Sequence, residues 1–160
     1  MAGQEDIEWI CVPLTDMSVT MLYDVMQLRS RVFVVEQACL WDEVDGYDKQ
    51  CHHLVGLRPS ASGDKDVVGY ARLIPALTKG AHQIRPIISR VVVPPECRGS
   101  GQGRALFQRA IAACKGLWPT MDIEIGAQHR LEAFYMSMGF QTISDPYDED
   151  GIQHVDMTHP

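Results

Sequence analysis

The segment that most constrains the fold of this chain is residues 91–104, VVVPPECRGSGQGR, where an apolar run meets a glycine-rich turn and then a helical pattern. Gly99, Gly101 and Gly103 stand at alternate positions, so side chains leave their backbone N–H groups uncovered. A helix that follows such a turn directs the positive end of its dipole toward it. The segment therefore predicts a strand, a turn and a helix that together bind an anion such as a phosphate.

Two common phosphate loops are excluded by single positions. Arg104 stands where the pattern G-x-G-x-x-G requires its third glycine, and no Lys-Ser or Lys-Thr pair follows as a Walker A loop requires. The pattern that remains is Arg-x-x-Gly-x-Gly, which begins at Arg98 after the apolar strand. Which phosphate compound the turn binds depends on the rest of the chain.

Length and charge limit the class of protein. The chain has 160 residues, 46% of them hydrophobic, which predicts one domain over residues 1–160, and no apolar run is long enough to cross a membrane. The formal net charge of −7 argues against nucleic acid as the main partner and favours cationic amines. We therefore expect neither a nucleic-acid nor a membrane partner.

The five cysteines are widely spaced, odd in number and without a C-x-x-C pair, so neither a disulfide framework nor a zinc site is indicated. We expect no bound metal. The segment Met1 to Asp6 is polar and acidic and shows no secretory signal. A reducing cytoplasm is the predicted location.

Apolar periodicity predicts alternating strands and helices in one order, β-α-loop-β-β-β-α-β-α-β-β. The expected strands are residues 7–12, 51–57, 67–74, 87–93, 121–125, a strand from 140, and 152–157. The expected helices cover a stripe of Val19, Leu22, Tyr23, Met26 and Phe33, then residues 106–117, and then about 128–138. The acidic run from Asp42 to Asp48 is interpreted as a solvated loop.

A second informative segment ends in Phe134-Tyr135-x-x-x-Gly139-Phe140. Together with Arg-x-x-Gly-x-Gly, it resembles the GNAT superfamily of acyl-CoA-dependent N-acyltransferases. When an amine attacks an acetyl thioester, the departing thiolate needs a proton, and a tyrosine hydroxyl can give it as a general acid. Tyr135 is the predicted acid.

Four further segments, residues 28–37, 45–48, 125–128 and 147–154, are similar to the ElaA family within GNAT. The likeness covers nearly the whole chain. It implies an α/β (α+β) GNAT fold, a mixed and mostly antiparallel sheet flanked by helices, in which splayed strands hold acetyl-CoA. It says far less about the acceptor.

The resemblance also implies the cofactor site, with strand 88–93 splayed from its neighbour near Gly126. The N–H of Val91 or Val93 is expected to stabilise the oxyanion. Gln128 stands where an asparagine commonly contacts the cofactor arm. The predicted acetyl-CoA-binding residues are Val91, Val92, Val93, Arg98, Gly99, Ser100, Gly101, Gln102, Gly103, Arg104, Gln128 and Tyr135.

The base that deprotonates the amine is less evident, because many GNAT enzymes carry a glutamate where this chain has Ser89-Arg90. The candidates are Glu36, Asp45, His52 and His53, of which we carry Glu36 and His53 forward with Tyr135 as catalytic residues. Adjacent histidines of a strand point to opposite faces, so only one of the two can face a cleft. A structural role stays open for one histidine, and a fold-supporting ion pair stays open for Glu36 and for Arg29.

The predicted activity is transfer of an acetyl group from acetyl-CoA to a primary amine of a small molecule or peptide, by direct attack in a ternary complex. Alternatives are acetylation of protein N-termini or lysines, an acyl-CoA-binding module without catalysis, and a nucleotide-binding regulator. A homodimer is left open, since Ile152 and Val155 would suit an interface or the second face of a covered hairpin.

Overall fold

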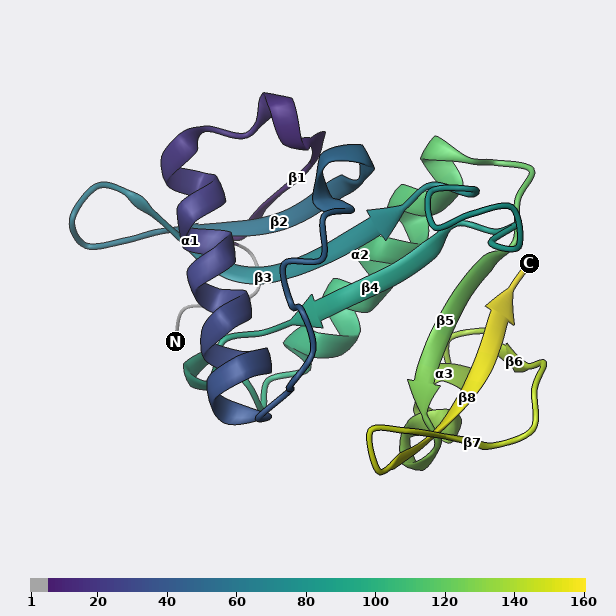
Figure 1. Ribbon diagram of the computed structural model, residues 1–160. Coiled ribbons are helices and arrows are strands. Elements are labelled where there is room, and N and C mark those ends of the chain that lie inside the picture. The colour runs from purple at the N-terminus through teal and green to yellow at the C-terminus, as the bar shows by residue number, and fades with distance from the viewer. Residues whose placement is uncertain (1–5) are drawn as a thin grey trace.

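The computed structural model describes residues 6–160 (Figure 1). The segment Met1–Glu5, part of the predicted domain and of the region where no secretory signal is expected, lies outside the described residues. Eight strands form one sheet in the order β1-β2-β3-β4-β5-β8-β6, with β7 paired to β8. The strands are β1 Glu8–Pro13, β2 His52–Pro59, β3 Lys65–Ile74, β4 Ile87–Val92, β5 Ile123–Gln128, β6 Gln141–Thr142, β7 Tyr147–Glu149 and β8 Ile152–His159. The α-helices are α1 Val19–Arg29, α2 Gln102–Leu117 and α3 Glu132–Met136.

The sheet is antiparallel except between β4 and β5, and this junction is where it opens. The parallel pairing holds at one position, Ile87 opposite Glu124, whereas β5 and β8 pair at six successive positions from Ile123 to Gln128. Beyond the single pair the two strands diverge (Figure 1). The predicted mixed, mostly antiparallel sheet flanked by helices is therefore confirmed, including the splayed strands.

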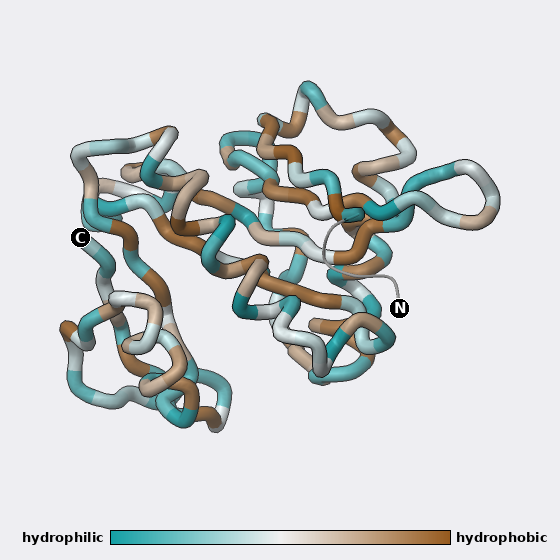
Figure 2. Tube along the Cα trace, turned by 180° about the vertical axis from the view of Figure 1, so that it is seen from behind, coloured by the Kyte–Doolittle hydropathy of each residue, from teal (hydrophilic) through white to brown (hydrophobic). Residues whose placement is uncertain are grey.

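Helices cover both faces of the sheet. Helix α1 packs on one face, while α2 lies on the opposite face (Figure 1). Hydrophobic residues gather along the strands and on one side of α2, whereas the connecting loops mix hydrophilic and hydrophobic residues (Figure 2). The core on the α1 face includes Val25, Leu28, Val55, Tyr70 and Val92. The larger core on the α2 face includes Leu73, Ile88, Leu106, Phe107, Ile123, Phe140 and Met157. Strand β4 contributes Ile88 to one core and Val92 to the other, as expected for a strand that is covered on both faces.

The first predicted helix exists, but its buried face is not the predicted one. Val19 and Tyr23 are 85% and 69% exposed, whereas Val25 and Leu28 lie in the core. Helix α1 continues into a π-helix, Ser30–Glu36, in which Phe33, the last residue of the predicted stripe, packs against the core on the α1 face.

Two later boundaries also differ from expectation. Strand β5 extends to Gln128 because its backbone pairs with β8 up to the contact between Gln128 and His154. The expected helix over 128–138 is therefore shorter: a 3-10 turn, His129–Leu131, leads into α3. Gln128 thus belongs to a strand end rather than to a helix.

The C-terminal strand β8 forms a hairpin with β7, and Asp150 and Gly151 connect the two through a turn with φ values of 52° and 82°. Val155 is buried in the larger core, so the suggestion that it offers an exposed interface is wrong. Ile152 is 47% exposed. Among residues 6–160, no helix combines the length and apolar character needed to cross a bilayer.

Candidate active site

A cavity of about 500 Å³ lies beside the diverging end of β4, against the start of α2 and α3. It is lined by Val91, Val92, Val93, Arg98, Gly99, Gly101, Gln102, Gly103, Arg104, Phe107, Phe134 and Tyr135. The structure thus brings together all the residues predicted to bind the cofactor except Ser100 and Gln128. We call this space the donor cavity.

The glycine turn has the geometry of an anion site. Gly99 and Gly101 adopt φ values of 88° and 76°, in the left-handed region that glycine enters at little cost. Gly101 caps the start of the sixteen-residue helix α2, and no side chain caps the first N–H groups. These donors and the helix dipole are directed at the donor cavity.

Two side chains of the turn already have partners within the protein. The buried Gln102 amide donates a 2.7 Å hydrogen bond to the carbonyl of Val68, so its side chain secures the turn to β3. The Arg104 guanidinium donates to the Ser137 hydroxyl at 3.1 Å and stacks 4.9 Å from the centre of the Phe134 ring. Ser100 is exposed in the turn outside the cavity lining.

Tyr135 lies at the inner wall of the donor cavity. Its ring packs against Phe107 at 5.0 Å and Phe134 at 5.3 Å between centroids. Burial raises the pKa of the phenol, so the hydroxyl stays protonated at neutral pH. No group of residues 6–160 hydrogen-bonds this hydroxyl, which leaves its proton available to a bound molecule.

The edge of β4 that faces β5 is open beside this cavity. Pairing of β3 with β4 jumps from Arg72 opposite Ser89 to Tyr70 opposite Val92, which is a β-bulge with an extra residue on β4. Arg90, inside the bulge, has φ of 53°, which non-glycine residues rarely adopt. Beyond Ile87 the strand also makes no further pair with β5. Backbone groups near Val91 and Val93 therefore border the gap.

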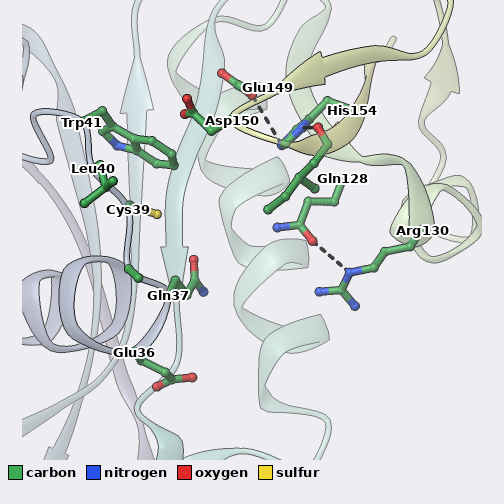
Figure 3. A pocket seen from close by; sticks show the side chains of 12 residues that line it. Glu36, Gln37, Cys39, Leu40, Trp41, Gln128, Arg130, Glu149, Asp150 and His154 are labelled. Carbon is green, nitrogen blue, oxygen red and sulfur yellow. Dashed lines mark hydrogen bonds and ion pairs between the residues drawn. The ribbon is translucent and has the colours of Figure 1, made fainter.

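A second cavity, of about 760 Å³, lies between the segment 36–41 and the ends of β5, β7 and β8 (Figure 3). A third, of about 640 Å³, is lined by β4 residues 87–90 and by Gly126 of β5. The two share four lining residues, Trp41, Glu149, Asp150 and His154. We call these connected spaces the acceptor cleft.

Glu36 lines the acceptor cleft, but its carboxylate is engaged. It accepts a 2.6 Å hydrogen bond from Arg98, whose side chain also donates to the carbonyl of Val93. The hydrogen bond from Arg98 holds the pKa of Glu36 below its usual value. Glu36 is therefore a weak proton acceptor and connects the cleft to the donor cavity.

The structure places His53 away from both spaces. Its side chain is completely buried, with one ring nitrogen 2.7 Å from the Tyr70 hydroxyl and the other 2.9 Å from the carbonyl of Asp48. Burial lowers the pKa of His53, which favours the neutral ring. His53 has a structural role here, and His52, whose ring meets Trp118 edge-on at 5.8 Å, does not line the cleft either.

A buried cluster of three arginines and three carboxylates supports the floor of the cleft. Its members are Arg29, Arg72, Arg90, Glu43, Asp45 and Asp48. Arg29 reaches Glu43 at 2.7 Å and Asp48 at 2.6 Å, and Arg72 reaches Asp45 at 2.8 Å. Residues 42–47 form the predicted loop and Asp42 is exposed, but the interpretation of the acidic run as solvated is wrong for Glu43 and Asp48, which are buried against these arginines.

The cluster fixes the charge of Asp45, another candidate base. Burial opposes its ionisation, but the hydrogen bonds from Arg72 and the Tyr47 backbone, together with the charges of Arg72 and Arg90, outweigh burial and hold its pKa well below the usual value. A carboxylate of such low basicity, bound on both oxygens by Arg72, is a poor proton acceptor. A fold-supporting ion pair was left open for Arg29 and for Glu36, and both residues form one. Arg29 pairs with Glu43 and Asp48, and Glu36 pairs with Arg98.

Gln128 lines the acceptor cleft instead of the donor cavity, and its side-chain oxygen accepts a 2.9 Å hydrogen bond from Arg130. Sequence reasoning missed Trp41 and His154 as cleft residues. The similarity of residues 147–154 to one family was the available signal, but it carried no role for any single side chain. Within residues 6–160 no group of three or more potential metal ligands is close enough to hold an ion.

Known proteins share this architecture and much of this sequence. Residues 56–159 match the family model for an acetyltransferase (GNAT) domain. ElaA of Escherichia coli (strain K12) is 36% identical over 154 residues, which cover 94% of this chain and 95% of ElaA. The crystal structure of E. coli ElaA matches 96% of this chain and 99% of its own with a TM-score of 0.83 at 34% identity.

A crystal structure of an acyl-CoA N-acyltransferase from Pseudomonas aeruginosa aligns equally well, with a TM-score of 0.84 and 34% identity over 96% of this chain and 99% of that one. The match of the family model alone spans more than half of the present chain. These similarities agree with the glycine turn, the splayed strands and the tyrosine beside them. The chain belongs to the GNAT family of acyltransferases, within its ElaA-like group.

Proposed function

We propose that the protein transfers an acetyl group from acetyl-CoA to a primary amine of a small molecule or peptide, by direct attack in a ternary complex. The observation that carries the proposal is the gap between β4 and β5, which has the donor cavity on one side and the acceptor cleft on the other. A thioester in the first and an amine in the second would meet at the unpaired edge of β4.

The donor residues supply three effects. The N–H groups of the glycine turn and the start of α2 bind the pyrophosphate, with Arg98 adding positive charge. The open edge of β4 binds the pantetheine amides as an added strand would. The N–H of Val91 or Val93 stabilises the oxyanion, and losing one such donor costs about 3 kcal/mol of barrier.

The proton balance gives Tyr135 its role. As the C–S bond breaks, the CoA sulfur leaves as a thiolate, and the protonated phenol donates to it as a general acid. The raised pKa of Tyr135 keeps that proton in place until the thiolate forms. Its free hydroxyl at the wall of the donor cavity supports this assignment.

Direct attack is favoured over an acyl-enzyme because the cleft offers no activated nucleophile. Cys39 lines the cleft, but burial raises its pKa and keeps it as the thiol. A ternary complex needs both substrates bound together, and the two spaces on opposite sides of the gap allow that. Steady-state kinetics should therefore show intersecting rather than parallel double-reciprocal lines.

The test is release of CoA thiol from acetyl-CoA with a panel of small amines, polyamines, amino sugars and short peptides. Thermal shift with acetyl-CoA reports donor binding, because a ligand at about 100 times its Kd adds about 2.7 kcal/mol of stability. Tyr135→Phe should lower kcat about 100-fold and keep that shift. A shift without turnover of any amine by the wild type would favour a non-catalytic acyl-CoA-binding module, and turnover of peptides alone would favour a protein acetyltransferase.

The proposed cytoplasmic location rests on the cysteines. All five are free thiols, and Cys51, Cys97 and Cys114 are buried. Proteins of oxidising compartments commonly pair their cysteines, so free thiols suit a reducing environment. A homodimer remains a proposal that sedimentation of the purified protein would test.

A further inference from the structure

His154 is the residue of the acceptor cleft whose role the preceding assignments leave open. It lies on the central part of the C-terminal hairpin, where it pairs with Gln128 of β5 on one side and with Tyr147 of β7 on the other. Its side chain is 13% exposed and lines the cavity shown in Figure 3. His154 also lines the other part of the cleft, so a mostly buried imidazole reaches the space where the amine is expected.

The hydrogen bonds of His154 fix which nitrogen can accept a proton. The Nδ1 atom lies 2.9 Å from the carbonyl oxygen of Ile152. A carbonyl only accepts, so Nδ1 carries the hydrogen and the lone pair of the neutral ring is on Nε2. Nε2 lies 3.4 Å from Oε2 of Glu149, which would stabilise the imidazolium once a proton arrives.

The groups around this ring come from several elements. Tyr147 of β7 stacks on it with ring centroids 6.0 Å apart and donates its own proton to Asp156 at 2.6 Å. The charged groups that line the cleft together with His154 are Glu36, Arg130, Glu149 and Asp150 in one part, and Asp42, Asp45, Lys79, Arg90, Glu124 and Asp156 in the other.

The lining of the acceptor cleft puts His154 near the expected point of reaction. One cavity of the cleft is lined both by His154 and by β4 residues 87–90, which directly precede the expected oxyanion donors. Gln128 pairs directly with His154. His154 therefore lies across the gap from the backbone groups expected to hold the acyl carbonyl.

The other candidate bases are already bound by arginine. The carboxylates of Glu36 and Asp45 are tied to Arg98 and Arg72, which lowers the pKa of both. Their proton affinity is thus reduced at the place where a base is needed. His154 has no arginine partner among residues 6–160.

We propose that Nε2 of His154 is the general base that deprotonates the acceptor ammonium, a role that rests on the proposed acetyl transfer.

Nε2 takes one proton from R–NH3⁺, and the amine lone pair then forms the C–N bond at the thioester carbonyl carbon. The C–S bond breaks, and the sulfur receives a proton from Tyr135. Tyr135 is replenished by the second proton that the nitrogen loses, and imidazolium returns its proton to water. Acceptor ammonium and acetyl-CoA thus give the acetamide, CoA thiol and one proton. Glu149 is a positioning residue.

The test compares two amines of nearly equal size. Ethylamine resembles lysine and is mostly protonated at neutral pH, whereas the electron-withdrawing fluorines of 2,2,2-trifluoroethylamine leave it mostly neutral there. At about pH 7, His154→Gln should lower kcat/KM for ethylamine about 100-fold. With trifluoroethylamine the loss should stay below about threefold, because that amine arrives without the proton.

Two more variants separate catalysis from structure. Glu149→Gln should show the same preference for the neutral amine with a smaller loss, and it covers the case in which His154→Gln folds poorly. His129→Gln is the matched control, since its Nε2 is also paired with a glutamate, Glu132 at 3.3 Å, but it lines neither part of the cleft. It should leave both rates unchanged.

An equal loss for both amines in His154→Gln, or no loss for either, would overturn the proposal while leaving acetyl transfer intact. If the wild type binds acetyl-CoA but acetylates neither amine, the proposed transfer to simple amines itself fails, and the assignment of the base falls with it. Measuring acetyl-CoA thermal shifts for all variants keeps these outcomes distinct.

Discussion

The donor cavity and the acceptor cleft are built in different ways. The donor cavity takes most of its lining from one continuous stretch, residues 91–104, and offers backbone N–H groups. The acceptor cleft takes its lining from segments far apart in the chain, residues 36–45, Lys79, 87–90, 124–130 and 147–156, and offers many charged side chains. A shared cofactor can thus be bound by a short local unit, whereas the acceptor site depends on long-range packing that can vary among relatives.

The support beneath the two spaces differs in the same sense. Arg29 and Arg72 are fully buried beneath the acceptor side and paired with carboxylates of the loop 42–48. The donor turn is instead held by left-handed glycines and by the buried amide of Gln102. Changes in buried charge should therefore act on the acceptor side and on overall stability, and changes in backbone shape should act on the donor side.

The largest expected effect follows from removing Arg29. Arg29→Met leaves Glu43 and Asp48 buried without the guanidinium that binds both. Breaking a buried ion pair from one side costs about 3–5 kcal/mol of unfolding free energy, measurable by urea denaturation. Arg31→Met is the matched control, because its ion pair with Glu96 is exposed on both sides, and it should change stability little. Equal effects of the two variants would contradict the importance given to the cluster.

Acid should weaken the same region. Asp45 and Asp48 have pKa values below those of the unfolded chain, because the arginines that bind them outweigh the opposing effect of burial. Their contribution to stability is therefore fully present above the unfolded pKa of about 3.9, and it is lost as the pH falls through the lower folded values. Urea unfolding at about pH 7 and about pH 3 should show this loss. Asp45→Asn, although less stable at neutral pH, should lose less on acidification than the wild type.

The donor side can be tested with two glycines of the same turn. Gly101 has φ of 76°, and Gly103 lies within α2 with an ordinary helical φ, yet an added Cβ meets nothing within 4 Å at either position. Gly101→Ala should therefore cost about 1 kcal/mol of stability, whereas Gly103→Ala should gain about 0.5–1 kcal/mol. If the backbone of this turn binds pyrophosphate, both methyl groups should weaken acetyl-CoA binding about tenfold, or about 1.4 kcal/mol, by calorimetry. Unchanged affinity in both variants would show that the pyrophosphate does not bind at this turn.

The contrast explains what could be predicted from sequence. The strand, turn and helix of residues 91–104 are specified by neighbours in the chain, so the sequence predicts together the glycines, the valines and Arg98 that line the donor cavity. Tyr135, which lines it too, was predicted because its surroundings, Phe134 and Gly139-Phe140, are also local. The cluster under the cleft was missed because the partners of residues 42–48 come from α1, β3 and β4. Sequence reasoning interprets an acidic run as solvated when the arginines that pair with it lie far away in the chain.

Long-range pairing also decided the boundaries that were missed. Strand β5 continues to Gln128 because β8, some thirty residues later in the chain, supplies backbone partners along its length. This extension of β5 places Gln128, paired with His154, at the acceptor cleft. No helical or strand periodicity within residues 121–138 indicates it. The π-helix after α1 likewise follows no α-helical spacing, and it brings Val32 as well as Phe33 to the core.

The smallest expected effect concerns the ion pair that joins the two regions. Glu36 belongs to the acceptor cleft and Arg98 to the donor cavity, and the pair is exposed on both sides. A pyrophosphate at the glycine turn would compete with Glu36 for the same guanidinium. Glu36→Gln should then tighten acetyl-CoA binding about threefold, as expected for an exposed pair, and leave stability unchanged, whereas Arg98→Gln should weaken binding. Calorimetry with acetyl-CoA at low and high salt measures both, and the gain in Glu36→Gln should shrink as salt screens the competition. Weaker binding in Glu36→Gln would mean that Glu36 positions Arg98 for the cofactor. The acceptor cleft and the donor cavity would then cooperate instead of competing for the Arg98 guanidinium.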